Sequence, residues 1–123
     1  MTPLQINQKI AEMKQLKMIH APNYSSSATA TLIFDAPDID KYDDWSYKNW
    51  AENISDAWEL FEEMPLAEIF HTNLKDVKYT VTIWVRNKHT DEFCLGDRKV
   101  FGKGITAPLT ICAAYITWRE SNA

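Results

Sequence analysis

Cysteine, histidine and glycine are scarce in this chain of 123 residues, which has two, three and three of them, respectively. No two His or Cys residues lie three or four positions apart, so the spacing typical of a metal site is missing. No apolar run reaches the roughly 18 residues that would cross a membrane, and the N-terminal segment lacks the basic and apolar parts of a secretory signal. We therefore expect no metal or other cofactor, no membrane association, and a location in the cytosol.

The two cysteines fall in different predicted elements, Cys94 in a strand and Cys112 in a helix. Cytosolic proteins keep most thiols reduced, and free cysteine is among the most frequently buried residue types. Two buried, reduced thiols are therefore the expected state, and a disulfide between them is the alternative.

All three glycines lie in the segment Gly96-Asp-Arg-Lys-Val-Phe-Gly-Lys-Gly104, just before a predicted helix. A phosphate-binding loop has four residues between its two glycines, but here five separate Gly96 from Gly102, and Gly104 stands where the magnesium-binding hydroxyl belongs. This spacing argues against a nucleotide-hydrolysing loop. A looser anion site near the helix start is still an open hypothesis, and a strand end with solvated charges is its alternative. The anion site would use Arg98, Lys99 and Lys103.

Large apolar and aromatic residues, in contrast, are plentiful. Hydrophobic residues make up 46% of the chain, and Trp, Tyr and Phe occur five times each. One aromatic side chain can bury on the order of 150–250 Å² of surface, and the chain length is close to the commonest size of a domain. We therefore expect residues 1–123 to form a single domain whose core is built from large side chains.

Apolar residues at helical spacing predict three helices. Thr2 is the expected cap of the first, and Asn53 of the second, with Asn49 as an alternative cap. The third begins at Thr106, is apolar on nearly all sides, and has Arg119 near its negative C-terminal end. The predicted helices cover residues 3–16, 53–64 and about 106–119.

The clearest strand signal is residues 77–85, where apolar and polar side chains alternate. Residues 92–101 are its expected antiparallel partner because the connection between them is short, and the β-branched run 28–34 predicts another strand. Residues 35–52 are expected to form a long loop, while residues 66–76 stay open between a short helix and a loop. The sequence therefore predicts an α+β fold, a small antiparallel β-sheet of about three strands packed by about three α-helices.

Three segments of the chain resemble a family of small phage and prophage proteins, the phage ABA sandwich domain family. These segments are Asp56-Ala-Trp-Glu-Leu-Phe-Glu-Glu-Met64, then the two predicted strands, and Thr106-Ala-Pro-Leu-Thr-Ile-Cys-Ala-Ala-Tyr115. Family members have a similar "AAWEVVEKM"-like helix, a hairpin and a "TAPEAICRAALL"-like final helix, and Leu4–Met18 is similar to their N-terminal helix. The resemblance implies a viral origin, and thus the host cytoplasm, together with a small sheet covered by helices. It implies no catalytic residues, because the family has no established activity.

Acidic residues are concentrated in one part of the chain. Residues 35–63 hold ten Asp and Glu and two Lys, a net charge of −8, whereas the rest of the chain carries +4. This part overlaps residues 23–50, which look longer and more acidic than the matching part of the phage family. A specialised role would therefore be located here.

The acidic segment around Asp38-Ile-Asp40 resembles the start of a calcium-binding loop. However, Tyr42 stands where a third oxygen ligand is needed, and Asp43 replaces the required glycine. A second interpretation is molecular mimicry, since closely spaced carboxylates can imitate nucleic acid while aromatic side chains anchor an interface. The alternative is a loop that packs its aromatics into the core and solvates its acids. The candidate partner-binding residues are Asp38, Asp40, Asp43, Asp44, Trp45, Tyr47 and Trp50.

The sequence shows no set of acid, base and nucleophile, so we expect a binding protein and not an enzyme. The leading hypothesis is a phage-encoded inhibitor of a host protein, such as an anti-CRISPR protein or a nuclease inhibitor, that does not itself contact nucleic acid. The alternatives are a nucleotide or small-anion sponge, and an accessory phage protein that forms oligomers without a ligand.

Overall fold

Three helices and six strands make up the described part of the chain. The computed structural model describes residues 1–16, 18–19, 31–35, 45–84 and 98–121. The elements are α1 (Pro3–Met13), β1 (Met18–Ile19), β2 (Leu32–Asp35), β3 (Trp45–Lys48), α2 (Ile54–Glu63), β4 (Ala67–His71), β5 (Tyr79–Trp84), β6 (Arg98–Gly104) and α3 (Ala107–Ser121). The strands form two antiparallel sheets, β1-β2-β3 and β4-β5-β6. The predicted α+β class, with three helices and a small antiparallel sheet, is confirmed, and a second small sheet adds to it.

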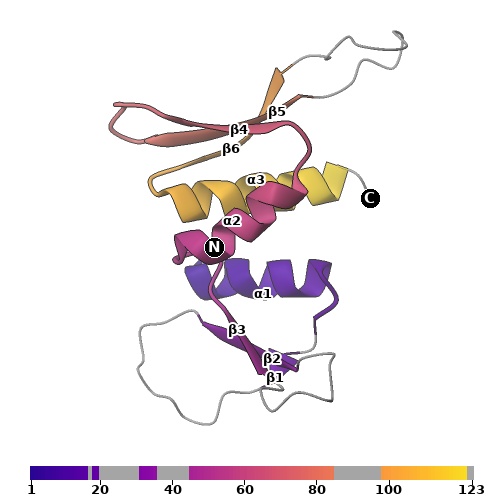
Figure 1. Cartoon of the computed structure of the whole chain (residues 1–123). Coiled ribbons are helices and arrows are strands. Elements are labelled where there is room, and N and C mark those ends of the chain that lie inside the picture. Colours follow the sequence, from indigo (N-terminus) through magenta and orange to yellow (C-terminus); the bar gives the residue numbers. More distant parts are fainter. Residues whose placement is uncertain (17, 20–30, 36–44, 85–97, 122–123) are drawn as a thin grey trace, which may run out of the picture.

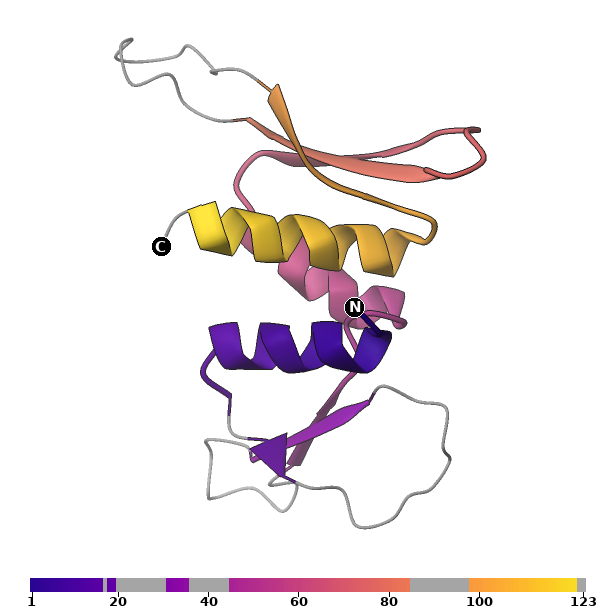
Figure 2. The ribbon, with the colours of Figure 1, turned by 180° about the vertical axis from the view of Figure 1, so that it is seen from behind.

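The helices lie between the two sheets (Figure 1). The sheet of β4, β5 and β6 forms one end of the molecule and packs on α3, beneath which lie α2 and α1, and the sheet of β1, β2 and β3 forms the other end. The view from behind shows the same order of layers (Figure 2). One face of each sheet therefore looks away from the helices.

The strand pairing of β5 and β6 contains an irregularity. Val81 pairs with Gly102, whereas Thr82 pairs with Val100, which leaves Phe101 as an extra residue in β6. An extra residue of this kind bends the strand and increases its local twist. Val81 and its neighbour on the same face, Ile83, are buried beneath this part of the sheet. The alternation that predicted this strand therefore places its apolar face in the core, as expected.

Two glycines of β6 allow α3 to approach the sheet closely. A Cβ atom at Gly102 would lie 2.5 Å from the Thr110 carbonyl oxygen and 2.7 Å from the Ala114 nitrogen, and one at Gly104 would lie 2.6 Å from Thr110 Oγ1. Such distances are shorter than any van der Waals contact, so a side chain at either position would push the helix away. Gly102 and Gly104, two of the glycines considered for an anion site, therefore serve helix packing.

Local side-chain and backbone hydrogen bonds set both ends of α1. Thr2 Oγ1 accepts a bond from the Gln5 amide (3.2 Å), and Gln5 Oε1 accepts one from the Thr2 amide (2.8 Å), which is a capping box. At the other end, Gln15 adopts a left-handed conformation (φ 57°), and the Leu16 amide donates to the Ala11 carbonyl over 3.0 Å. This Schellman turn ends the helix at Met13, three residues before the predicted end.

Helix α2 begins where the sequence predicts. Asn53 Oδ1 accepts bonds from the amides of Ser55 (2.9 Å) and Asp56 (3.2 Å), so Asn53 is the N-cap. The alternative cap, Asn49, has another task, because its Oδ1 accepts a bond from the side chain of Asn7. Asn7 is fully buried and also accepts a bond from the Ala51 amide (2.9 Å). A buried amide in α1 thus fixes the turn that leads from β3 into α2.

Some predicted boundaries differ from the structure. The loop expected at 35–52 is wrong in part, since β3 lies within it, and the undecided segment 66–76 contains β4. The first strand was expected at 28–34, but β2 starts at Leu32 and continues to Asp35. Cys94, Gly96 and the first half of the strand expected at 92–101 lie outside the described residues.

The core brings together side chains from all three helices, from β5 and from the turn before α2. It consists of Ile10, Ala11, Trp50, Ala51, Ala57, Leu60, Met64, Val81, Ile83, Ile111, Cys112, Ala114 and Tyr115. Cys112 is a free thiol, as expected for a buried helix position. Burial raises its pKa to about 12, so it is not a nucleophile at neutral pH.

Candidate functional site

The acidic aromatic segment is only partly within the described residues. Asp38, Asp40, Asp43 and Asp44 lie outside them. Trp45 and Tyr47 belong to β3, where they pair with Asp35 and Ile33 of β2, respectively. The four aspartates therefore stay a prediction from the sequence.

Trp50, the last residue predicted to contact a partner, is a core residue. Only 1% of it is exposed, in the turn that Asn7 holds. A tryptophan gains more by burying its large apolar surface than by leaving it in water. The expectation that Trp50 contacts a partner directly is therefore wrong, and the alternative, an aromatic packed into the core, holds at this position.

An exposed acidic aromatic surface lies instead on α2. Trp58 is 43% exposed and Ile54 is 49% exposed, although both are large apolar residues. The ring of Trp58 stacks on that of Phe61, with 4.6 Å between centroids and 21° between planes. Helical geometry places Glu62 one turn after Trp58 and Glu59 beside it, and both are exposed. We call Ile54, Trp58, Glu59, Phe61 and Glu62 the α2 face.

The sequence contains a signal for this face, although the residues predicted to bind a partner lie in the segment before it. Positions 54, 58 and 61 are four and three residues apart, so they form a second stripe on α2. The first stripe, Ala57, Leu60 and Met64, is buried. One core contact cannot cover both apolar stripes of this ten-residue helix. Trp58 and Ile54 of the second stripe therefore remain partly exposed.

The three cations of the alternative anion site do not converge. Arg98 and Lys99 are neighbours in β6, so their side chains leave opposite faces of the sheet. Lys103 pairs with Thr80 and Arg98 with Trp84, four residues further along β5, so the two cations are on the order of 13 Å apart. At the nearby start of α3, the Leu109 amide already donates a hydrogen bond to Thr106 Oγ1 (3.3 Å), so it is not available to bind an anion.

Arg98 belongs to a cluster on the face of the sheet that looks away from α3. Its Nη2 lies 2.8 Å from Glu68 Oε2, and its guanidinium lies 4.8 Å from the ring centre of Phe70 and 5.5 Å from that of Trp84. Trp84 Nε1 also donates to Glu68 (3.3 Å). These contacts hold the Arg98 side chain in this cluster, so it does not point toward the glycines of β6.

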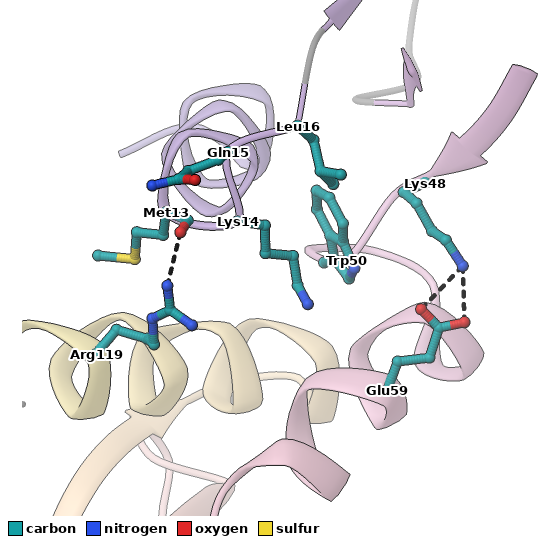
Figure 3. Close-up of a pocket in the computed structure, with 8 residues that line it drawn as sticks. All are labelled: Met13, Lys14, Gln15, Leu16, Lys48, Trp50, Glu59 and Arg119. Carbon is teal, nitrogen blue, oxygen red and sulfur yellow. Dashed lines mark hydrogen bonds and ion pairs between the residues drawn. The ribbon is translucent and has the colours of Figure 1, made fainter. Parts of the chain in front are cut away.

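A hollow of about 510 Å³ lies between the end of α1, the end of β3, α2 and the last turns of α3 (Figure 3). Trp50 and Leu16 lie side by side in its wall, and Lys14 extends between Trp50 and Arg119. The hollow is lined by Met13, Lys14, Gln15, Leu16, Lys48, Trp50, Glu59 and Arg119. The sequence analysis missed this set because its members come from four elements and share no local pattern.

The two sides of the hollow differ in how their charges are matched. On one side, Lys48 Nζ lies 2.7 Å and 2.9 Å from the two oxygens of Glu59 and 3.8 Å from Asp56. On the other side, Lys14 Nζ lies 2.6 Å from Glu63. Arg119 Nη2 donates to the Met13 carbonyl over 2.7 Å. The sequence placed Arg119 at the end of its own helix, and the structure shows that it caps the end of α1 as well.

Glu63, Tyr115 and Arg119 are linked beside this hollow. Burial raises the pKa of Tyr115 to about 12, and its hydrogen bond to Glu63 adds to this effect. Burial also tends to raise the pKa of Glu63, but the hydrogen bonds from Lys14 and Tyr115 and the charges of Lys14 and Arg119 outweigh it, so the pKa of Glu63 is lowered. At neutral pH Glu63 is therefore a carboxylate and Tyr115 a neutral phenol.

Neither a metal centre nor a membrane helix is found in the part of the chain that the structure describes. Within those residues, no group of three or more His, Cys, Asp or Glu side chains is placed to hold a metal ion. None of the described helices is long and apolar enough to cross a bilayer.

Comparison of the chain with protein-family models, with curated proteins and with solved structures gave no match. The resemblance to the phage family therefore stays a prediction from the sequence. The site has to be interpreted from its own chemistry.

Proposed function

We propose that this chain is a phage-encoded, non-enzymatic inhibitor that binds a host protein through an acidic aromatic surface. The observation that carries the proposal is the exposed Trp58, stacked on Phe61 and flanked by Glu59 and Glu62. The partner would present a cationic groove, such as the one in which a nucleic-acid-handling enzyme holds its phosphates.

The composition of the α2 face supports an interface. Tryptophan is strongly enriched among the residues that dominate binding energy, and a ring already stacked in place loses little conformational freedom on binding. Glu62 beside it would steer a cationic partner toward the face and disfavour anionic ones, while Glu59, which pairs with Lys48, would contribute less. Asp38, Asp40, Asp43 and Asp44 lie in the same acidic stretch of sequence and would extend the anionic surface.

The test uses purified host nucleases, including CRISPR effector nucleases, each loaded with labelled duplex DNA. We expect the native chain to displace DNA from at least one of them, and Trp58→Ala to weaken this competition at least tenfold, since a central aromatic anchor contributes about 2 kcal/mol or more. Phe70→Ala is the matched control, because Phe70 is 41% exposed but lies on the sheet, away from the α2 face.

A second variant set tests the charge. Reversing Asp38, Asp40, Asp43 and Asp44 to lysine should abolish competition while the far-UV circular dichroism stays that of the native chain. Competition that survives both this set and Trp58→Ala would refute the proposal, as would a native chain that displaces DNA from none of the nucleases. Light scattering on the same samples distinguishes binding to the nuclease from self-association of the chain.

A further inference from the structure

Among the described residues, the side of the hollow formed by Lys14 and Arg119 has more cations than carboxylates (Figure 3). Lys14 and Arg119 both act on Glu63, so two cations share one carboxylate there. Within the described part of the chain, the Arg119 guanidinium donates to two neutral acceptors, the Met13 carbonyl and the Tyr115 hydroxyl (3.4 Å). An added anion would therefore complete the charge balance between these two side chains.

The negative end of α1 does not cancel this charge. The last carbonyls of a helix carry a partial negative charge, but the Met13 carbonyl already accepts a bond from one nitrogen of Arg119. A guanidinium has five N–H donors in a flat fork, so donors remain beyond those that bond the Met13 carbonyl and the Tyr115 hydroxyl. Lys14 adds an ammonium from the opposite side, and the two together suit the oxygens of a carboxylate or a phosphate.

The rest of the lining suits an apolar body attached to that anion. Leu16 gives the hollow an apolar patch next to Lys14, and the buried ring of Trp50 lies beside Leu16 and closes the wall there. The volume of about 510 Å³ lies within the roughly 300–1,000 Å³ usual for small-molecule sites. On the far side Lys48 faces two carboxylates, Glu59 and Asp56, so this side would repel the anionic group of a ligand toward Lys14 and Arg119.

We propose that this hollow binds a small organic anion, with its carboxylate or phosphate group between Lys14 and Arg119 and its apolar part against Leu16. The site is separate from the α2 face except for Glu59, and it differs from the anion site that the sequence suggested on β6. Ligand binding in the hollow therefore does not depend on the proposed protein partner.

The experiment is a calorimetric titration of the full chain with benzoate and, separately, with phenyl phosphate. Both probes carry the same ring, so they distinguish a preference for carboxylate from one for phosphate. We expect saturable binding of at least one of them with a Kd of about 1 mM or tighter, weakening as sodium chloride is raised because the contact is ionic.

Two lysines of α1 provide a matched pair of variants. Lys14→Gln removes a cation of the hollow, whereas Lys9→Gln removes a cation that pairs with Glu120 of α3 outside it (3.3 Å). Lys14→Gln should raise the Kd on the order of tenfold, the usual effect of losing a charged hydrogen bond, and Lys9→Gln should leave it unchanged. Arg119→Lys, which keeps the charge but loses the flat fork, should also weaken binding and serves if Lys14→Gln does not fold.

The result that overturns the proposal is either no saturable binding of both probes to the native chain, or an equal loss of affinity in Lys14→Gln and Lys9→Gln. Neither result bears on the proposed inhibitor function, whose test relies on Trp58.

Discussion

Replacing Gly102 with alanine tests the close packing of α3 on β6. The new Cβ would meet the Thr110 carbonyl oxygen at 2.5 Å, the Ala114 nitrogen at 2.7 Å and the Ala114 Cβ at 2.9 Å. Two of these three atoms are helix backbone, so no change of rotamer can relieve the contact and α3 must move away from the sheet. Overpacking of this kind costs about 3 kcal/mol, a large part of the 5–15 kcal/mol that typically stabilises a domain.

Whether Gly102→Ala stabilises or destabilises the protein shows whether α3 contacts this glycine. If α3 did not touch this glycine, alanine would stabilise the strand by about 0.5–1 kcal/mol, because glycine loses more backbone freedom on folding. Urea unfolding followed by circular dichroism would measure the difference directly. We expect the midpoint of Gly102→Ala to fall steeply, with a loss in melting temperature of roughly 10 °C.

Gly104 provides the matched comparison. A Cβ at Gly104 meets mainly the Thr110 side chain, Oγ1 at 2.6 Å, while the Thr110 nitrogen and Cα are at 3.3 Å and 3.4 Å. Thr110→Ala should therefore rescue much of the loss in Gly104→Ala and none of the loss in Gly102→Ala. A Gly102→Ala protein as stable as the native one, or equal rescue at both positions, would show that the described packing of α3 is wrong.

Two further predictions concern the buried Asn7 and the ion-paired Glu63. Asn7→Leu should destabilise the fold by about 1–3 kcal/mol, because the Ala51 amide loses its acceptor inside the protein; a loss below about 0.5 kcal/mol in urea unfolding would contradict this role. The folded state lowers the pKa of Glu63 from its ordinary value of 4.5, mainly through Lys14 and Tyr115 acting against burial. Its stabilising effect is therefore complete above pH 4.5 and is lost as the pH falls through the lower, folded value. Unfolding measured from pH 6 to pH 2 should thus show a steeper loss for the native chain than for Glu63→Gln, and parallel curves would refute the link.

Local signals in the sequence predicted several elements well. The alternation around Val81 and Ile83 identified β5, and Thr2 and Asn53 cap the helices that they were expected to cap. These features depend on neighbouring residues along the chain, so a single sequence contains them. The α+β class followed from the same local signals.

Features that depend on distant residues were not predictable in the same way. Strand β3 has only four residues and is held by pairing with β2, so its alternation was too short to distinguish from a loop. Trp50 looked like a surface anchor because acids precede it, but Asn7, more than forty positions earlier, fixes the turn that buries it. The packing role of Gly102 could not be predicted for a similar reason, since the atoms that require this glycine belong to α3.

The distribution of charge inferred from the sequence differs clearly from the one in the structure. The sequence gives residues 35–63 a net charge of −8, yet Glu63 pairs with Lys14 of α1, and Asp56 and Glu59 both lie near Lys48. These ion pairs are only partly exposed, and they reduce the negative field on one side of α2. The anionic surface left for a partner is therefore narrower than the composition suggests. Among the described residues of α2, this surface includes Glu62 beside Trp58, which is why the aromatic residue, and not the number of carboxylates, is the sharper test of the proposed interface.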